Sequence, residues 1–165
     1  MKRRPLLVLA AAAAVLAGCG FELRRAPDFA FSSIAVAASP NSAMANELKR
    51  SIAADGKVTV VDPARRDTAQ VVMDFVSEQR EKVVVGMSAT GQVREFQLRT
   101  RLRFRLRTPA GKELIPETEL LQQRDISFNE SAVLAKESEE NLLYRDMQTD
   151  LVQQLMRRLA AVKTL

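Results

Sequence analysis

The sequence lacks histidine and tryptophan altogether and contains one cysteine, Cys19, among its 165 residues. Without histidine, no side chain titrates near neutral pH by default, and the Ser-His and Cys-His pairs of hydrolases are excluded. Zinc sites that depend on imidazole or on several thiolates are excluded for the same reason. The carboxylates follow neither a glycine-rich loop nor a recognisable catalytic spacing. We therefore expect no enzymatic activity, no metal site and no cofactor.

A lone cysteine also rules out an intramolecular disulfide, so packing must stabilise the fold. The position of that cysteine is informative. Lys2, Arg3 and Arg4 precede an apolar run from Leu6 to Leu16. This run is too short for the ~20 residues of a membrane-spanning helix and is typical of a signal peptide.

The end of this segment, Leu16-Ala17-Gly18-Cys19, resembles the lipobox of bacterial lipoproteins. The other interpretation is an ordinary secretory signal followed by an unrelated cysteine. We predict that residues 1–18 are removed, that Cys19 is acylated, and that residues 19–31 form a lipidated tether. Several acyl chains anchor a protein firmly, since each buried CH₂ contributes about 0.8 kcal/mol. Gly20 in place of an aspartate favours the outer membrane.

Charge gives little support for a nucleic-acid partner. Removal of the signal takes three of the 25 basic residues away and leaves 22 against 20 acidic residues, a net charge of +2. So small an excess does not predict a binder of nucleic acid.

Hydrophobic periodicity predicts one α+β domain over residues 32–165. Ser39 and Pro40 are expected to open a first helix, with Met44, Leu48 and Ile52 on its buried face. A second, longer helix is expected over about 130–161, with its apolar stripe in the core. Strands are expected at 33–38, 57–61, 69–85, 96–107 and 117–128, with a loop at 63–67 and a hairpin connection at 86–91. The predicted fold is a two-layer sandwich: a four- to five-stranded, mostly antiparallel or mixed sheet with two helices on one face.

The strand at 96–107 alternates almost strictly between apolar residues and arginines. At a period of two, the apolar side chains face the core and the arginines share the opposite face. These arginines either pair with carboxylates such as Asp74, Glu78, Glu119 and Asp125, or meet anions or a polar protein wall. The partner- or anion-facing candidates are Arg99, Arg101, Arg103, Arg105 and Arg107.

Several weak motifs, taken in order, resemble the LPS-assembly lipoprotein family LptE. They are the start Cys19-Gly20-Phe21-Glu22-Leu23-Arg24, the strand-helix-strand opening, the long hairpin with Gly91-Gln92 near its tip, and a last helix led in by residues 132–137. The resemblance spans essentially the whole mature chain.

The resemblance implies a lipid-anchored outer-membrane protein on the periplasmic side, seated inside the lumen of the β-barrel LptD. The two proteins would form the translocon that inserts lipopolysaccharide into the outer leaflet, and the lipoprotein would assist assembly of the barrel. Lys136 falls where the family has a basic residue implicated in lipopolysaccharide binding. A second basic residue of the family, just before the hairpin tip, is absent from the uncharged segment 87–90. Lys82 or Arg94, on the flanks of the hairpin, are the candidates to replace it.

An alternative stays open at this point. The chain would then be a free lipoprotein facing the periplasm that binds an anionic lipid or another envelope protein.

Overall fold

The computed structural model describes residues 27–54 and 56–165. The expected signal peptide and Cys19 lie outside these residues. The described elements, in chain order, are β1 (Ser33–Ala37), α2 (Ala43–Ala53), β2 (Thr59–Val61), the short 3-10 helix η1 (Pro63–Thr68), β3 (Val71–Met87), β4 (Val93–Arg107), β5 (Glu113–Ser127), a 3-10 turn η2 (Glu130–Ala132) and α3 (Val133–Ala161).

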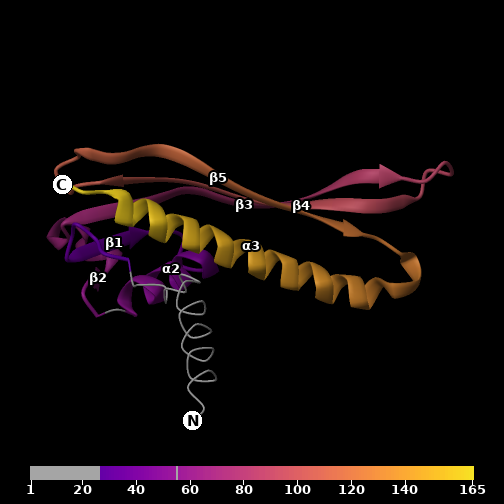
Figure 1. Cartoon of the computed structure of the whole chain (residues 1–165), viewed down its shortest axis with the longest axis horizontal. Coiled ribbons are helices and arrows are strands. Elements are labelled where there is room, and N and C mark those ends of the chain that lie inside the picture. The colour runs from indigo at the N-terminus through magenta and orange to yellow at the C-terminus, as the bar shows by residue number, and fades with distance from the viewer. Residues whose placement is uncertain (1–26, 55) are drawn as a thin grey trace, which may run out of the picture.

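The five strands form one mixed sheet in the order β2-β1-β3-β4-β5. β1 is parallel to both β2 and β3, whereas β3, β4 and β5 are antiparallel neighbours. Both helices lie on the same side of the sheet, and the long strands extend well beyond α2 (Figure 1). The predicted α+β class and the two-helix layer are confirmed.

The main core lies between the helices and the part of the sheet near the C-terminus of the chain. The predicted stripe of α2, Met44, Leu48 and Ile52, is fully buried. It packs in one cluster with Phe104 of β4 and Leu155 of α3. Phe31 belongs to the same cluster and Phe29 packs against it, so the last residues of the expected tether contact the core. The apolar face of β4 is therefore the platform on which both helices pack.

A smaller second core lies farther along the sheet, where Leu98 and Ile126 meet Tyr144 and Met147 of α3. Polar contacts separate the two cores. Gln148 of α3 accepts a hydrogen bond from Arg80 (2.9 Å) and donates one to Glu47 of α2 (2.6 Å). Burial raises the pKa of Tyr144 and nearby Glu140 adds to the rise, so its hydroxyl remains a donor to the carbonyl of Glu81 (2.8 Å).

A β-bulge at Val76 explains how polar residues of β3 come to face the helices. The pairing with β4 shifts between Phe75 and Ser77, so that Glu78 lies opposite Leu102. An extra residue in one strand reverses which side chains point to each face. Val71, Met73 and Phe75 face the core as predicted, but beyond the bulge the same face carries Glu78, Arg80 and Lys82.

Most predicted bounds differ from the observed ones by one to four residues, and two of the differences change the local structure. Helix α2 starts at Ala43 and is capped by Ser42, whose hydroxyl accepts from the amide of Ala45 (3.0 Å). Ser39 and Pro40 instead form the preceding turn, closed by a hydrogen bond from the Ser42 amide to the Ser39 carbonyl. The expected loop at 63–67 is the 3-10 helix η1, which Asp62 caps. Ser42 lies three residues after Ser39, and both are suitable N-cap residues. The sequence alone therefore does not determine which of them caps the helix.

Candidate functional site

The best-formed candidate site lies at what we call the distal end of the molecule. This end consists of the tip of the β3–β4 hairpin, the end of β5, η2 and the first turns of α3. In Figure 1 the hairpin tip and the start of α3 diverge at the end opposite the C-terminus. Gly91 closes the hairpin with a φ of 78°, a conformation that favours glycine.

A pocket of about 70 Å³ lies between the hairpin and α3. Its lining combines apolar side chains with cations and carboxylates: Lys82, Phe96, Ile126, Ser127, Phe128, Val133, Lys136, Glu137 and Glu140. Two of the three residues that the sequence suggested for lipopolysaccharide binding, Lys82 and Lys136, therefore line one pocket. They are 54 positions apart in the chain and come from β3 and α3.

Both lysines already have acidic partners. Lys82 pairs with Glu140 (2.6 Å), and its ammonium lies 4.4 Å from the centre of the Phe96 ring. Lys136 pairs with Glu139 (2.8 Å) and donates to the hydroxyl of Ser127 (3.0 Å). An anion entering the pocket would have to compete with these two carboxylates or share the lysines with them.

The third candidate, Arg94, lies in a neighbouring hollow with Phe128, Asn129 and Ser131. Phe128 lines both hollows and packs edge-to-face on Phe96, with ring centres 5.3 Å apart. Arg94 is exposed, and among the described residues its side chain makes a single long contact of 3.5 Å, with the side chain of Gln92. The three cations thus surround an aromatic floor, which suits a ligand that is anionic and apolar at once.

The distal end also gathers exposed hydrophobic side chains. Of the large hydrophobic residues that are exposed in the described chain, most lie there: Val83, Val84, Val85, Met87, Val133 and Leu134. Leu134 is 80% exposed. Exposed apolar side chains gathered at one end of a molecule indicate a contact with another molecule or with lipid.

The arginine row of β4 lies on the sheet face opposite the helices, as the alternation predicts. Its members are largely paired across the strands: Arg101 with Glu119 (2.8 Å), Arg103 with Glu117, and both Arg105 and Arg107 with Asp74 (2.9 Å each). Arg99 donates to Gln97 (2.8 Å). Two of the four expected carboxylate partners are used here, Asp74 and Glu119. Glu78 bonds Ser42 on the other face, and Asp125 accepts from Gln97.

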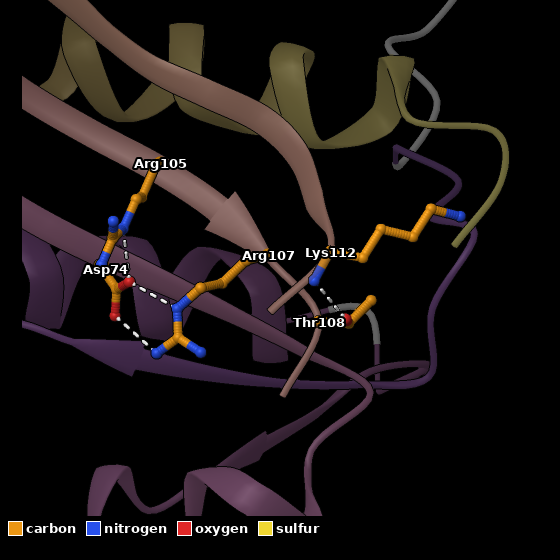
Figure 2. Close-up of polar contacts among 5 residues, drawn as sticks. All are labelled: Asp74, Arg105, Arg107, Thr108 and Lys112. Carbon is orange, nitrogen blue, oxygen red and sulfur yellow. Dashed lines mark hydrogen bonds and ion pairs between the residues drawn. The ribbon is translucent and has the colours of Figure 1, made fainter. Parts of the chain in front are cut away.

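Asp74 holds the end of this row together. Figure 2 shows the guanidinium groups of Arg105 and Arg107 converging on its carboxylate, beside the turn that Thr108 and Lys112 close. Burial raises the pKa of Asp74, but hydrogen bonds from Arg107 and Arg105 outweigh it and leave the pKa below its usual value. The side chain is 16% exposed, so its ionised form depends on these two partners.

We expect Asp74→Ala to lower the free energy of unfolding by about 1–3 kcal/mol, because two half-buried guanidinium groups lose their acceptor. The lowered pKa stabilises the fold above the unfolded pKa of about 3.9, and this stabilisation is lost as pH falls through the lower folded pKa. Urea unfolding of both proteins between neutral and acidic pH measures this. The difference between them should shrink as the solution is acidified.

Asp125→Ala is the matched control for Asp74→Ala. Asp125 is exposed and, within the part of the chain that the structure describes, its carboxylate accepts from Gln97 alone, so its replacement should change stability by less than about 0.5 kcal/mol. Equal effects of the two substitutions would contradict a special role of Asp74.

Several residues of these sites could not be found from sequence. Glu140 and Glu117 were not expected as partners of Lys82 and Arg103, because the pairs depend on long-range packing and on the register of β5. Phe96 was expected in the core as part of the apolar face of its strand, and together with Phe128 it also forms the floor of the distal pocket. In residues 27–54 and 56–165 there is no group of acidic residues that could hold a metal ion, and no helix there is long and apolar enough to cross a membrane.

Comparison with known proteins identifies the family. The profile of LptE, described as lipopolysaccharide assembly, matches residues 31–159, which include the whole sheet and most of α3. This chain belongs to the LptE family. Membership makes it a lipoprotein of lipopolysaccharide assembly in the cell envelope and not an enzyme.

Individual relatives agree with this assignment. The LPS-assembly lipoprotein LptE of Pectobacterium atrosepticum is 26% identical over 159 residues, which cover 94% of this chain and 84% of that protein. The protein of the same name from Yersinia pestis is 28% identical over 166 residues, with 98% and 78% covered.

Solved structures support the fold. An uncharacterized lipoprotein B from Nitrosomonas europaea superposes with a TM-score of 0.73 at 33% identity and covers 86% of this chain and 91% of its own. The rare lipoprotein B of Shewanella oneidensis shares the fold at 20% identity, with a TM-score of 0.64 and coverage of 78% and 94%. The distal pocket and the arginine row of this chain therefore lie on a fold that these solved lipoproteins share.

Proposed function

We propose that this chain is held in the outer membrane by a lipid on Cys19 and sits in the lumen of an LptD-type β-barrel, where it assists assembly of the barrel. Together the two proteins would deliver lipopolysaccharide to the outer leaflet. The observation that carries the proposal is membership in the LptE family over residues 31–159. The curated relatives are themselves named LPS-assembly lipoproteins.

The sheet supports a partner on the face opposite the helices. That face is polar and internally paired, with Arg101–Glu119 and Arg103–Glu117 as rungs across β4 and β5. Paired charges on a β-sheet face resist aggregation and still offer hydrogen-bonding groups to a polar wall. We assign this arginine row to contact with the barrel.

The distal pocket is the proposed lipopolysaccharide contact. Lys82, Lys136 and Arg94 would meet the phosphate groups, and Phe96, Phe128 and the exposed side chains of the hairpin would meet acyl chains. Ammonium and guanidinium groups form strong charge-assisted hydrogen bonds to phosphate.

Depletion of this chain tests the proposal in cells. The barrel protein should lose its mature, assembled form, because it would lack its internal partner. The measurement is the amount of mature barrel in outer-membrane fractions, together with co-purification of the barrel with the tagged chain from detergent extracts.

Arg101→Glu with Arg103→Glu should weaken this co-purification, because reversed charges would face Glu117 and Glu119. Undisturbed barrel levels after depletion would favour the free periplasm-facing lipoprotein instead.

A further inference from the structure

Besides the arginine row, the molecule has a strongly charged region at its end opposite the distal pocket. We call this end the proximal end. β1, β2 and β3 are parallel and β5 runs in the same direction as β3, so all four begin there. Helix α3 ends at the same place, and α2 returns the chain there from the end of β1 to the start of β2 (Figure 1). Residues from distant parts of the sequence are therefore collected at this end.

Cations without a carboxylate partner concentrate here. The end of α2, η1 and the end of α3 carry the residues that we call the proximal basic surface: Lys49, Arg50, Arg65, Arg66, Arg157, Arg158 and Lys163. Within the described part of the chain, none of them forms an ion pair, and all but half-buried Lys49 are exposed. By contrast, the lysines and arginines that do form ion pairs lie along the sheet and at the distal end.

The elements that carry the seven residues are neighbours, since α2 contacts both α3 and β2, and β2 contacts η1. Lys49 and Arg65 line one hollow together with Val60 and Asp62. α2 and α3 pack side by side, since Leu48 and Ile52 share a core cluster with Leu155 and Leu159. The carboxylates that the described chain places at this end are fewer: Asp28, Asp62, Asp67, Glu113 and the C-terminus. Even with the Asp62 carboxylate, which caps η1 (2.8 Å), counted in full, the seven cations exceed these five carboxylate groups by two.

A structural role accounts for only part of this charge. Arg50 and Arg158 lie in the last turns of α2 and α3, where a cation offsets the negative end of the helix dipole. Arg65 and Arg66 belong to a short 3-10 helix with no comparable dipole, and both are exposed. Compensation of a helix dipole therefore does not account for these two arginines.

The chain also enters the fold at this end. Pro27, Phe29 and Phe31 line a hollow with Lys57 and Gln70, beside the start of β3. Cys19 is eight residues before Pro27 in the sequence. A fully extended segment of that length reaches at most about 28 Å. A lipid on Cys19 would thus keep the proximal basic surface within about 30 Å of the bilayer.

We infer that the proximal basic surface binds the anionic phospholipid headgroups of the membrane leaflet that holds the lipid anchor. This inference rests on the proposed acylation of Cys19 for the position of the surface, but the binding itself is independent of the acyl chains. Basic residues near an anionic leaflet each strengthen attachment about fivefold, so this surface would add to the attachment that the acyl chains already supply. The second contact would orient the domain with its distal pocket pointing away from that leaflet.

Vesicle flotation tests the inference on the mature chain, residues 19–165, with Cys19→Ser to remove acylation. The core residues lie between Phe31 and Leu159, so this change is outside the packed fold. We expect binding to vesicles of phosphatidylethanolamine and phosphatidylglycerol and none to phosphatidylcholine vesicles. Binding should disappear near 0.5 M salt, where the Debye length falls to about 4 Å.

Paired variants locate the contact. Arg157→Glu with Arg158→Glu, and separately Arg65→Glu with Arg66→Glu, should each weaken binding at least about tenfold, and the corresponding glutamine pairs should weaken it less. Arg124→Glu with Arg145→Glu makes the same change of charge away from this end, at residues that belong to none of the proposed contacts, and should leave affinity within about twofold. Thermal melting of each variant confirms that it is folded.

Two results would overturn the inference: equal affinity of the Cys19→Ser chain for neutral and anionic vesicles, or equal losses in the proximal and control pairs. The outcome is separable from the proposed function. If the proximal residues bind only headgroups, lipidated chains that carry the proximal substitutions will still co-purify with the barrel. If the proposed barrel partner is wrong, binding of the chain to vesicles will be unchanged.

Discussion

Replacing Phe104 by alanine will lower the free energy of unfolding by about 3–5 kcal/mol, the largest effect that we expect of any single substitution. Phe104 lies on the interior strand β4, is fully buried and belongs to the cluster in which both helices meet the sheet. Its loss removes apolar contacts and leaves a cavity that rigid strands cannot close. A domain of this size has about 5–15 kcal/mol of stability, so the variant would be close to unfolding.

Chemical denaturation followed by circular dichroism measures this loss. Phe104→Leu retains most of the side-chain volume and should lower the free energy of unfolding by about half as much as Phe104→Ala, or less. Leu142→Ala removes a similar side chain from α3 at a position that is 55% exposed, and should change stability by less than about 0.5 kcal/mol. Similar losses for Phe104→Ala and Leu142→Ala would show that the helices do not pack on β4 as described.

The second large effect concerns ligand binding at the distal pocket. We expect Lys82→Gln with Lys136→Gln to weaken lipopolysaccharide binding at least about tenfold, because a hydrogen bond to a charged group contributes about 1.5–3 kcal/mol. Stability should change little, since Lys82–Glu140 and Lys136–Glu139 are surface ion pairs. Displacement of a fluorescent lipopolysaccharide probe measures the affinity, and thermal melting measures the stability.

Arg145→Gln is the control for this pair, because Arg145 is an exposed cation of the same helix that does not line the pocket. An affinity that is unchanged in the lysine double variant would refute the pocket as the contact. A comparable loss in Arg145→Gln would point instead to attraction by overall charge.

The elements of the fold followed closely from local patterns. Alternation in β4 placed Phe104 and Leu106 in the core and their arginine neighbours on the other face, because strand geometry has a period of two. Spacings of three and four residues gave the buried stripes of α2 and α3, because a helix turns every 3.6 residues.

The prediction failed where one residue changed the pattern. The bulge at Val76 reverses the facing of β3, and this cannot be read from the alternation of Glu78, Arg80 and Lys82. As a result, Glu78 was expected beside the arginine row but lies under α2, where it accepts from Ser42 (2.6 Å). The same reversal turns Lys82 towards α3 and allows it to pair with Glu140.

Sequence by itself determined the class of the protein: the absence of histidine excluded most catalysis, the segment before Cys19 predicted a lipoprotein, and local periodicity predicted two helices on one face of a sheet. These properties depend on composition or on neighbours a few residues apart. Only the tertiary structure decided that Lys82 and Lys136 line one pocket, that Asp74 holds two arginines, and that seven cations gather where the chain enters the fold. Each of these depends on strand order, register and helix direction, which long-range packing determines and which no local pattern encodes.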